Sequence, residues 1–389
     1  MWASRGGVCA IAAAIACGCA AASGPLVFAE AVRDGEAGVT GIDEPAAIAI
    51  SPDGAQVYVA GSGANAVAIF ARNAATGALH PAGVVRDGAR GVDGLDQPGD
   101  IALSPDGANV YVAGFDADAL AVFARDATSG KLRFLSVMRD RVGGVRGLGG
   151  AVSVVVSPDG GAVYVAGRQD DSIAVFARDP NTGRLRFVER KREKEFGPTA
   201  LAIAPDGRHL YLSGFDASAL AVFERDPDSQ RLRRVAIVRD ADDPTHALTN
   251  AASVAVSPDG ATVVAAGYGE DALELFERDS ETGELHRLAT ARAGVDAPAR
   301  LRHPLGVAFS PDGSEVYAAA AEPGALVAFD VSEGGLRPRS VHIDAGAPAV
   351  AEACAVAVSP DGAHVYVAGY GQSAIALFRR GDGKAGESN

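Results

Sequence analysis

The sequence has few cysteines, and most of them lie at its beginning. Of the four cysteines, Cys9, Cys17 and Cys19 fall within residues 1–22, so a chain without this segment keeps only Cys354. A single cysteine forms no intramolecular disulfide. The small apolar residues around Cys354 are typical of a buried position rather than of a nucleophile. The folded part is therefore expected to be stable without disulfides.

Basic residues are outnumbered by acidic ones. The chain has 35 Lys and Arg against 49 Asp and Glu, a formal net charge of −14 at pH 7. Such a surface repels nucleic acid and anionic lipid, because phosphate binding requires clustered Lys and Arg. We therefore exclude nucleic acid as a partner. The hydrophobic content of 48% also excludes a disordered chain, and the 48 glycines lack the period of collagen.

Long hydrophobic runs are absent beyond the N-terminus. Residues 1–5 form a short positive segment, residues 6–22 are apolar, and Ala20-Ala21-Ala22 suits cleavage by a signal peptidase. We interpret residues 1–22 as a secretory signal peptide, which places the protein in the periplasm or outside the cell. A lipid anchor on Cys17 or Cys19 is an alternative fate of this segment. No other run reaches the roughly 18 apolar residues of a membrane span.

The rest of the sequence is built from seven copies of one unit. A turn, Ser-Pro-Asp-Gly in six copies and Ala-Pro-Asp-Gly in one, recurs every 47 to 53 residues. Its copies begin at Ser51, Ser104, Ser157, Ala204, Ser257, Ser310 and Ser359. Proline sets the first turn position, aspartate bonds its own backbone and glycine takes a positive φ, so each turn joins two short apolar strands. A third strand ends in phenylalanine every time, at Phe70, Phe123, Phe176, Phe223, Phe276, Phe329 and Phe378.

Each unit has the pattern of a propeller blade. A polar turn and a fourth strand follow the phenylalanine, and the strands are apolar on both sides, as they must be when a sheet is packed between two neighbours. The repeated tyrosines, of which Tyr58 is the first, and the repeated phenylalanines are therefore expected in the core. The fifth unit has Val264 where the six others have tyrosine. The sequence predicts an all-β, seven-bladed β-propeller with four antiparallel strands per blade.

The two ends of the chain complete one blade between them. No fourth strand follows Phe378, whereas residues 25–34 have the fourth-strand pattern and are similar to residues 132–140. We expect this N-terminal strand to close the last blade, so that no sheet edge stays open. The propeller is assigned to residues 23–380, followed by a flexible tail at 381–389, and a monomer is expected.

The loops that lead from each fourth strand to the next blade are long and variable, and function tends to gather on such loops. They end at the mouth of the central channel, where the residue seven before each turn is expected. These residues are Glu44, Gln97, Gly150, Gly197, Asn250, His303 and Glu352. Asp100 lies three residues deeper than Gln97, and His246, Arg300 and Arg302 belong to the same loops.

A histidine with carboxylates and arginines at one mouth suits general acid–base work on an ester or lactone. The base takes a proton from water, the acid serves the leaving oxygen, and an arginine holds an anionic group. The candidate catalytic residues are Glu44, Arg302, His303 and Glu352. The candidate ligand-binding residues are Gln97, Asp100, His246, Asn250 and Arg300. The alternative is that these side chains only hydrate the rim of the channel.

Metal and cofactor motifs are scarce. The sequence after residue 22 has neither a Cys-x-x-Cys pair nor a zinc-protease histidine motif, so neither a transition metal nor an organic cofactor is expected. Residues 87–96 offer oxygen ligands that suit calcium, although they lack the spacing of an EF-hand, and a hydrated turn is the alternative.

The unit Ser-Pro-Asp-Gly-x-x-Val-Tyr-Val-Ala-Gly, with Ala-Val-x-Phe after it, resembles the YVTN repeat of lactonase-like seven-bladed propellers. The resemblance covers about residues 25–380. It implies either of two activities, 6-phosphogluconolactonase or carboxymuconate cyclase, or a secreted propeller without a reaction.

Two hypotheses follow. The uniform blades favour an exported scaffold that binds a small molecule, glycan or protein through its long loops. The alternative is a lactone hydrolase or related cyclase that uses His303, Glu44, Glu352 and Arg302.

Overall fold

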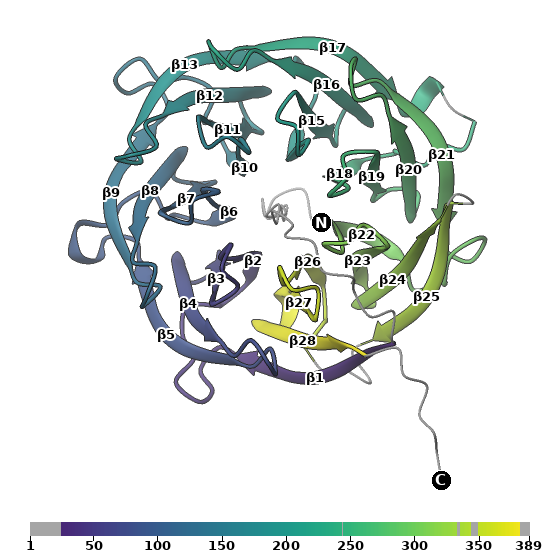
Figure 1. The fold of residues 1–389 in the computed structure, drawn as a ribbon, viewed down its shortest axis with the longest axis horizontal. Helices are drawn as coiled ribbons and strands as arrows, with labels where there is room; N and C mark the ends of the chain where they lie inside the picture. The colour runs from purple at the N-terminus through teal and green to yellow at the C-terminus, as the bar shows by residue number, and fades with distance from the viewer. Residues whose placement is uncertain (1–24, 243, 333–334, 344–348, 382–389) are drawn as a thin grey trace.

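The structure, a computed structural model, describes residues 25–242, 244–332, 335–343 and 349–381. In these residues 28 β-strands form seven four-stranded antiparallel sheets arranged in a ring (Figure 1). The predicted seven-bladed β-propeller is confirmed. The proposed signal peptide with its cysteines and nearly all of the proposed tail lie outside the described residues. None of the helices described is long and apolar enough to cross a membrane.

Every sheet runs from an innermost strand at the channel to an outermost strand at the rim (Figure 1). The innermost strands are β2 (Pro45–Ile50), β6 (Pro98–Leu103), β10 (Ala151–Val156), β14 (Pro198–Ile203), β18 (Ala251–Val256), β22 (Arg302–Phe309) and β26 (Ala353–Val358). The second strands are β3 (Gln56–Gly61), β7 (Asn109–Gly114), β11 (Ala162–Gly167), β15 (His209–Gly214), β19 (Thr262–Gly267), β23 (Glu315–Glu322) and β27 (His364–Gly369). The third strands are β4 (Ala66–Arg72), β8 (Ala119–Arg125), β12 (Ser172–Arg178), β16 (Ala219–Arg225), β20 (Ala272–Arg278), β24 (Ala325–Ser332) and β28 (Ala374–Arg380). The outermost strands are β5 (Leu79–Arg86), β9 (Leu132–Arg139), β13 (Leu185–Arg192), β17 (Leu232–Arg239), β21 (Leu285–Arg292), β25 (Gly335–Ile343) and β1 (Leu26–Arg33).

We number the blades 1 to 7 in the order of their innermost strands, so that blade 7 contains β26, β27, β28 and β1. The last of these pairs antiparallel with β28, as the closure prediction required. Phe28 is opposite Phe378, and their ring centroids are 5.8 Å apart. Among the described residues, three short 3₁₀ turns lie in the loops, η2 (Ala89–Gly91), η3 (Asp240–Asp242) and η4 (Tyr370–Gln372).

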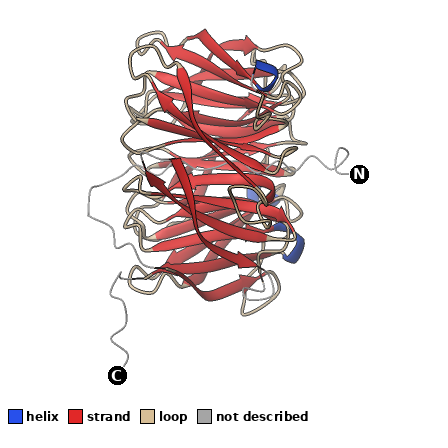
Figure 2. Ribbon diagram, turned by 90° about the vertical axis from the view of Figure 1, so that its right-hand side faces the viewer, coloured by secondary structure: helices blue, strands red, loops and turns tan. Residues whose placement is uncertain are grey.

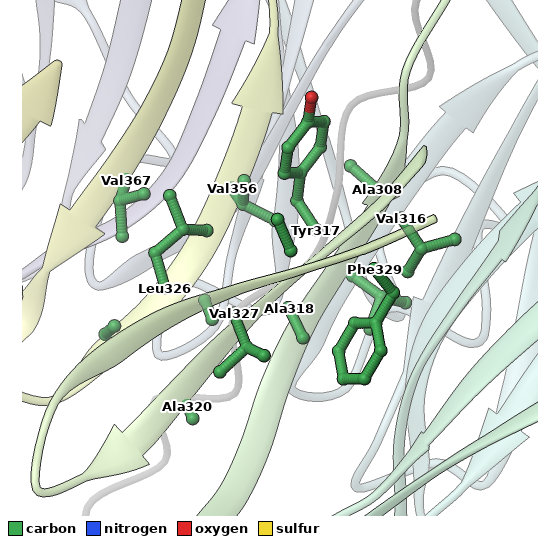
Figure 3. Close-up of a cluster of buried hydrophobic side chains, with 14 of the residues drawn as sticks. Ala308, Val316, Tyr317, Ala318, Ala320, Leu326, Val327, Phe329, Val356 and Val367 are labelled. Atoms are coloured by element: carbon green, nitrogen blue, oxygen red, sulfur yellow. The ribbon is translucent and has the colours of Figure 1, made fainter. Parts of the chain in front are cut away.

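Burial follows the layers of the ring. The three inner strands of each blade are buried almost throughout, and Phe329 of blade 6 and Val356 of blade 7 belong to one cluster between neighbouring blades (Figure 3). Cys354 is buried as expected. The outermost strands differ from the prediction of two apolar sides, because β13 and its equivalents are largely half-exposed. Neighbouring sheets diverge toward the rim, so their outer strands are only partly covered (Figure 1). Seen from the side, the strands run between the two faces of the ring, and the loops lie on both faces (Figure 2).

The Ser-Pro-Asp-Gly turns have the predicted geometry. In blade 1, Asp53 Oδ1 accepts hydrogen bonds from Ser51 Oγ at 2.5 Å and from the Ala55 N–H at 3.0 Å. Gly54 has a φ of 68°, which a side chain would strain. We call the side of the ring that carries these turns the turn face. The opposite side, which carries the long loops into each next blade, is the loop face.

A buried arginine joins each of six pairs of neighbouring blades at the turn face. Arg178 of blade 3, with a side chain 1% exposed, forms an ion pair of 2.8 Å with Asp106 in the turn of blade 2. It also donates hydrogen bonds to Tyr111 Oη, Asn109 Oδ1 and the Gly160 carbonyl. Burial acts to raise the pKa of Asp106, but hydrogen bonds from Ser104, Ala108 and Arg178 hold it below its ordinary value. The equivalent ion pairs are Arg72–Asp361, Arg125–Asp53, Arg225–Asp159, Arg278–Asp206 and Arg380–Asp312.

The interface between blades 5 and 6 is the exception. Val331 takes the place of the arginine in blade 6, and Val264 takes the place of the tyrosine in blade 5. At four of the other interfaces the arginine and the tyrosine at these two positions bond to each other, as Arg178 does to Tyr111. The two valines therefore replace both partners of one contact. The turn aspartate of blade 5, Asp259, bonds only its own turn through Ser257 and Ala261 among the described contacts. At the turn face this interface therefore lacks the buried arginine contact of the others.

Candidate functional site

The residues seven positions before the turns form one ring at the loop face, as the repeat register predicts. All seven have positive φ values: Glu44, Gln97, Gly150, Gly197, Asn250, His303 and Glu352. In six blades the N–H of this residue donates to a side chain of the preceding blade, as His303 does to Asp271 Oδ1 at 2.7 Å. A left-handed backbone at this position is thus common to all seven blades. It gives the side chains of this ring equivalent starting positions in each blade.

His303 lies among charged side chains of two blades. Its Nε2 is 3.9 Å from Asp271 Oδ1, and its Nδ1 is 3.8 Å from Glu322 Oε2. Arg302, half of whose side chain is exposed, reaches the same carboxylates at 3.6 and 3.8 Å. Asp271 belongs to the turn between β19 and β20, and Glu322 ends β23. The arrangement brings one imidazole, one guanidinium and two carboxylates together at the loop face.

Aromatic side chains continue this cluster along the ring. Tyr268 stacks on the imidazole of His303 with ring centroids 4.4 Å apart and an interplanar angle of 15°. Phe215 lies 5.7 Å from Tyr268, and the Arg168 guanidinium lies 5.2 Å from the centroid of Phe215. Burial raises the pKa of Tyr268, with Glu322 and Asp271 adding to the shift. Its hydroxyl therefore keeps its proton at neutral pH.

Sequence reasoning missed Tyr268, Asp271 and Glu322. The sequence does carry a signal for Tyr268. It lies eleven positions after the first residue of its Ser-Pro-Asp-Gly turn, where the second strand of each blade ends and the connection to the third strand begins. In the seven blades this residue is Ser62, Phe115, Arg168, Phe215, Tyr268, Ala321 and Tyr370. The residue type at this position varies among the blades as much as it does at the position of His303, and the two positions are neighbours in the fold.

The two predicted catalytic glutamates belong to a second group. Tyr370 Oη donates a hydrogen bond of 2.7 Å to Glu44 Oε2, and the Tyr370 N–H donates to the Glu352 carbonyl at 3.3 Å. The carboxylates that form ion pairs with His303 are Asp271 and Glu322 instead. His303 and Arg302 are thus brought together as predicted, while Glu44 is placed with a tyrosine.

The predicted ligand-binding residues are spread over the loop face and the channel wall. Gln97 and Asn250 are half-buried in the same ring as His303, and Asn250 Nδ2 donates to the Phe215 carbonyl at 3.1 Å. His246 is exposed in its loop, with Nδ1 3.2 Å from Asp240 Oδ2. Arg300 is exposed in the loop after β21.

Asp100 is fully buried between blades 2 and 3. Its Oδ2 accepts hydrogen bonds from the Val154 N–H at 2.7 Å and Ser153 Oγ at 3.2 Å, and its Oδ1 accepts from the Ile101 N–H at 2.8 Å. Burial raises the pKa of Asp100 to about 7 despite these donors. The carboxyl group is hydrogen-bonded to the edge of β10 that pairs with no other strand. Its side chain is inaccessible to solvent.

Stability is expected to fall as the pH rises because of Asp100. The unfolded carboxyl ionises near 3.8 and the folded one near 7, so between these values the folded chain holds the extra proton. The free energy of unfolding should then decrease by up to about 1.4 kcal/mol per pH unit from pH 4 to 7 and level off above. Asp100→Ser removes the titrating group and keeps an acceptor, as Ser153 does at the same register by accepting from the Leu201 N–H. Denaturant unfolding from pH 4.5 to 8 measures the difference, and parallel profiles of the two proteins would contradict this assignment.

The proposed calcium loop uses its carboxylates within the protein. Asp87 Oδ1 accepts from the Leu95 N–H at 2.8 Å, Asp93 pairs with Arg139, and Asp96 accepts from Asn65. The described residues contain no group of three or more His, Cys, Asp or Glu side chains arranged to hold a metal ion.

Comparison with known proteins places the chain among propellers of one family. The model of the family described as lactonase, 7-bladed beta-propeller, matches residues 21–144, 138–248 and 236–348. No curated protein matches the chain.

Solved structures share the fold at low sequence identity. A protein of Bacteroides uniformis assigned as a 6-phosphogluconolactonase is 21% identical with a TM-score of 0.64, over 76% of this chain and 84% of its own. The periplasmic gluconolactonase of Pseudomonas aeruginosa is 22% identical with a TM-score of 0.62, over 76% and 86%. The hydrazine synthase of Kuenenia stuttgartiensis is 20% identical with a TM-score of 0.64, over 89% and 98%. At these identities the likeness establishes the fold, which serves different reactions.

Proposed function

Because the chain belongs to the family of lactonase seven-bladed β-propellers, we propose that it hydrolyses a lactone at the loop-face mouth of its channel, with His303 as the general base. The observation that carries the proposal is the cluster of His303 with Asp271, Glu322 and Arg302. Family membership favours this enzymatic alternative over the binding scaffold that the uniform blades indicated.

The reaction needs one proton acceptor and one stabiliser of negative charge. His303 takes a proton from water as the water oxygen bonds to the lactone carbonyl carbon, and the ring C–O bond then breaks. The proton passes to the leaving oxygen, so that a hydroxy acid is formed. Asp271 and Glu322 stabilise the imidazolium, and Arg302 faces the oxyanion and then the product carboxylate. The His303–carboxylate distances of 3.8 and 3.9 Å are compatible with this role, because catalytic contacts tighten when substrate binds.

Tyr268 has a positioning role in this proposal. Its ring stacks on the imidazole at 4.4 Å and so restricts the rotation of His303. The Asp271 carboxylate is itself held by the N–H of His303 at 2.7 Å. Both contacts orient the base before the substrate arrives, which is how a rigid scaffold contributes to catalysis.

A proton-release assay tests the proposed reaction. Purified protein of residues 23–389 is incubated with glucono-1,5-lactone, γ-butyrolactone and dihydrocoumarin in weak buffer with a pH indicator. We expect acid release faster than spontaneous hydrolysis for at least one of them. Rates equal to the spontaneous ones with all three would return the protein to the binding-scaffold hypothesis.

We propose in addition that the protein is exported by residues 1–22. The short basic start and the apolar run of this segment support export, as does the periplasmic location of the Pseudomonas aeruginosa relative. Mass spectrometry of the N-terminus of the processed protein tests it. A free N-terminus near residue 23 is expected, a lipid on Cys17 or Cys19 would indicate an anchored form, and an intact Met1 would contradict export.

A further inference from the structure

A histidine replaces a side-chain amide at two of the blade interfaces. The position lies five residues after the first residue of each turn, at the start of the second strand. It is Gln56 or Asn109 in blades 1 and 2, and His209 or His364 in blades 4 and 7. Asn109 Oδ1 accepts a hydrogen bond of 2.8 Å from Arg178 of the next blade, and Gln56 Oε1 accepts one from the equivalent arginine. An amide serves this contact at any pH, because it does not titrate.

Both histidines accept hydrogen bonds from the same kind of arginine. His209 Nδ1 lies 2.9 Å from Arg278 Nη2, and His364 Nδ1 lies 2.7 Å from Arg72 Nη2. Because a guanidinium only donates, Nδ1 has to accept, and the imidazole is therefore neutral with its proton on Nε2. A second proton, on Nδ1, removes the acceptor and places two cations side by side.

The two imidazoles are enclosed by the next blade. His209 is 1% exposed and His364 is 2% exposed. Gly283 packs against the first imidazole and Gly77 against the second, so closely that a Cβ on either glycine would overlap the ring. A proton gained in the folded state therefore lies next to an arginine without water to screen the two charges.

The carboxylates beside His209 do not offset this effect. The charged and titratable groups around His209 and its neighbour on the strand are Asp206, Arg208, Tyr211, Glu224, Arg278 and Asp279. Burial lowers the pKa of His209 and Arg278 lowers it further, while Asp206 and Glu224 act in the opposite direction. The folded chain therefore binds this proton at a lower pH than the unfolded chain.

The same balance holds at His364. The charged and titratable groups around it and its neighbour on the strand are Glu30, Arg72, Asp361, Tyr366 and Arg379. Burial lowers the pKa of His364 and Arg72 lowers it further, against Asp361 and a backbone hydrogen bond of Thr76. Both histidines are thus neutral in the folded ring at neutral pH.

The two histidine interfaces lie on opposite sides of the ring, between blades 4 and 5 and between blades 7 and 1 (Figure 1). Together they separate blades 1–4 from blades 5–7. We propose that acid loosens the ring at these two interfaces, because His209 and His364 each gain a proton and lose the hydrogen bond from arginine. The interfaces with amide acceptors, between blades 1 and 2 and between blades 2 and 3, keep this contact.

Denaturant unfolding of wild type and His209→Asn/His364→Asn from pH 4.5 to 7.5 tests the proposal. Asparagine keeps an acceptor, as Asn109 does in blade 2. As the pH falls below about 6.5, the unfolding constant of the wild type should rise by up to about tenfold per pH unit for each histidine, since the unfolded chain binds the proton more readily. The double variant should lack this rise. Parallel profiles of the two proteins would overturn the proposal.

Two features of this comparison isolate the histidines. Asp100 titrates alike in both proteins, so its effect cancels in the difference. The control variant is His80→Asn, which replaces an exposed histidine and should keep the wild-type profile. Loss of the acid-dependent rise in this control as well would contradict the assignment to the buried pair.

Hydrogen exchange of the wild type locates the opening and needs no variant. After correction for the intrinsic exchange rate, residues 204–211 and 359–366 should lose protection between pH 7 and pH 5, whereas residues 104–111 at the Asn109 interface should keep it. Equal loss in all three segments would mean that acid opens the whole ring, and the proposal would fail. No lactone is present in either experiment, so the outcome is independent of the proposed hydrolysis.

Discussion

Replacement of His303 by glutamine should lower kcat/KM for lactone hydrolysis by two to four orders of magnitude. The expected loss follows from removal of the group that accepts the proton of water, and general base catalysis contributes about 10²- to 10⁴-fold. Glutamine is the right replacement because Gln97 occupies the same register in blade 2 with a φ of 46°, close to the 51° of His303. The backbone therefore accepts it, and the Asp271 contact to the N–H can persist.

The control is His80→Gln on the outermost strand β5, where the side chain is exposed and far along the sheet from the channel. This variant should keep wild-type kinetics and have the same melting temperature as the His303 variant. Initial rates over a range of lactone concentrations measure kcat and KM separately. Wild-type kcat/KM in His303→Gln would remove the histidine from the mechanism and leave the family assignment untouched.

The second large effect is expected at the turn face. Arg178→Val should destabilise the propeller by about 3–5 kcal/mol, because a buried charge network loses one partner. Tyr111 Oη, Asn109 Oδ1 and the Gly160 carbonyl each lose a donor. Asp106 is 43% exposed on its side chain and so recovers part of its hydration. Denaturant unfolding measures the change.

A double-mutant cycle makes this prediction sharp. The interface between blades 5 and 6 has valine at both positions, so Arg178→Val combined with Tyr111→Val rebuilds that apolar pair between blades 2 and 3. The double variant should be less destabilised than the sum of the single variants, with a coupling of about 1–3 kcal/mol. Strictly additive effects would mean that the two side chains act independently.

The fold could be predicted because its information is local and repeated. Each turn fixes a hairpin by its own proline, aspartate and glycine, and seven copies at near-constant spacing leave one arrangement of sheets. The closing strand could be recognised because residues 25–34 have a pattern that the end of the chain lacks. The half-exposed outermost strands differed from expectation because sheet divergence at the rim is a property of the ring as a whole.

The site could be predicted only where the register determines it. Counting seven residues back from the turn found His303, since the loop end has the same backbone in every blade. Its carboxylate neighbours were missed because Asp271 lies on the preceding blade and Glu322 on the next strand. Contacts of this kind depend on how far side chains reach between sheets. Glu44 was paired with His303 in the prediction, but the hydroxyl of Tyr370 is its partner.

The arginine network was also readable in part. An arginine follows two residues after the third-strand phenylalanine in six blades, and valine follows in the blade after Val264. The repeat of Phe-x-Arg is visible in the sequence. Its partners are not, because each of these arginines pairs with an aspartate of the previous unit, and four of them also bond to its tyrosine.

The paired valines at 264 and 331 bear on how such a ring grows by duplication. Every blade but the sixth carries an arginine that fits its predecessor, and every blade but the fifth carries a tyrosine and an aspartate that fit its successor. A copied or transplanted blade therefore brings half of a contact at each of its edges. It matches any neighbour of the common type, but not Val264 or Val331. The unit that duplication has to preserve is thus the interface between two blades rather than a single blade. At the interface between blades 5 and 6, recombination would have to exchange Val264 and Val331 together.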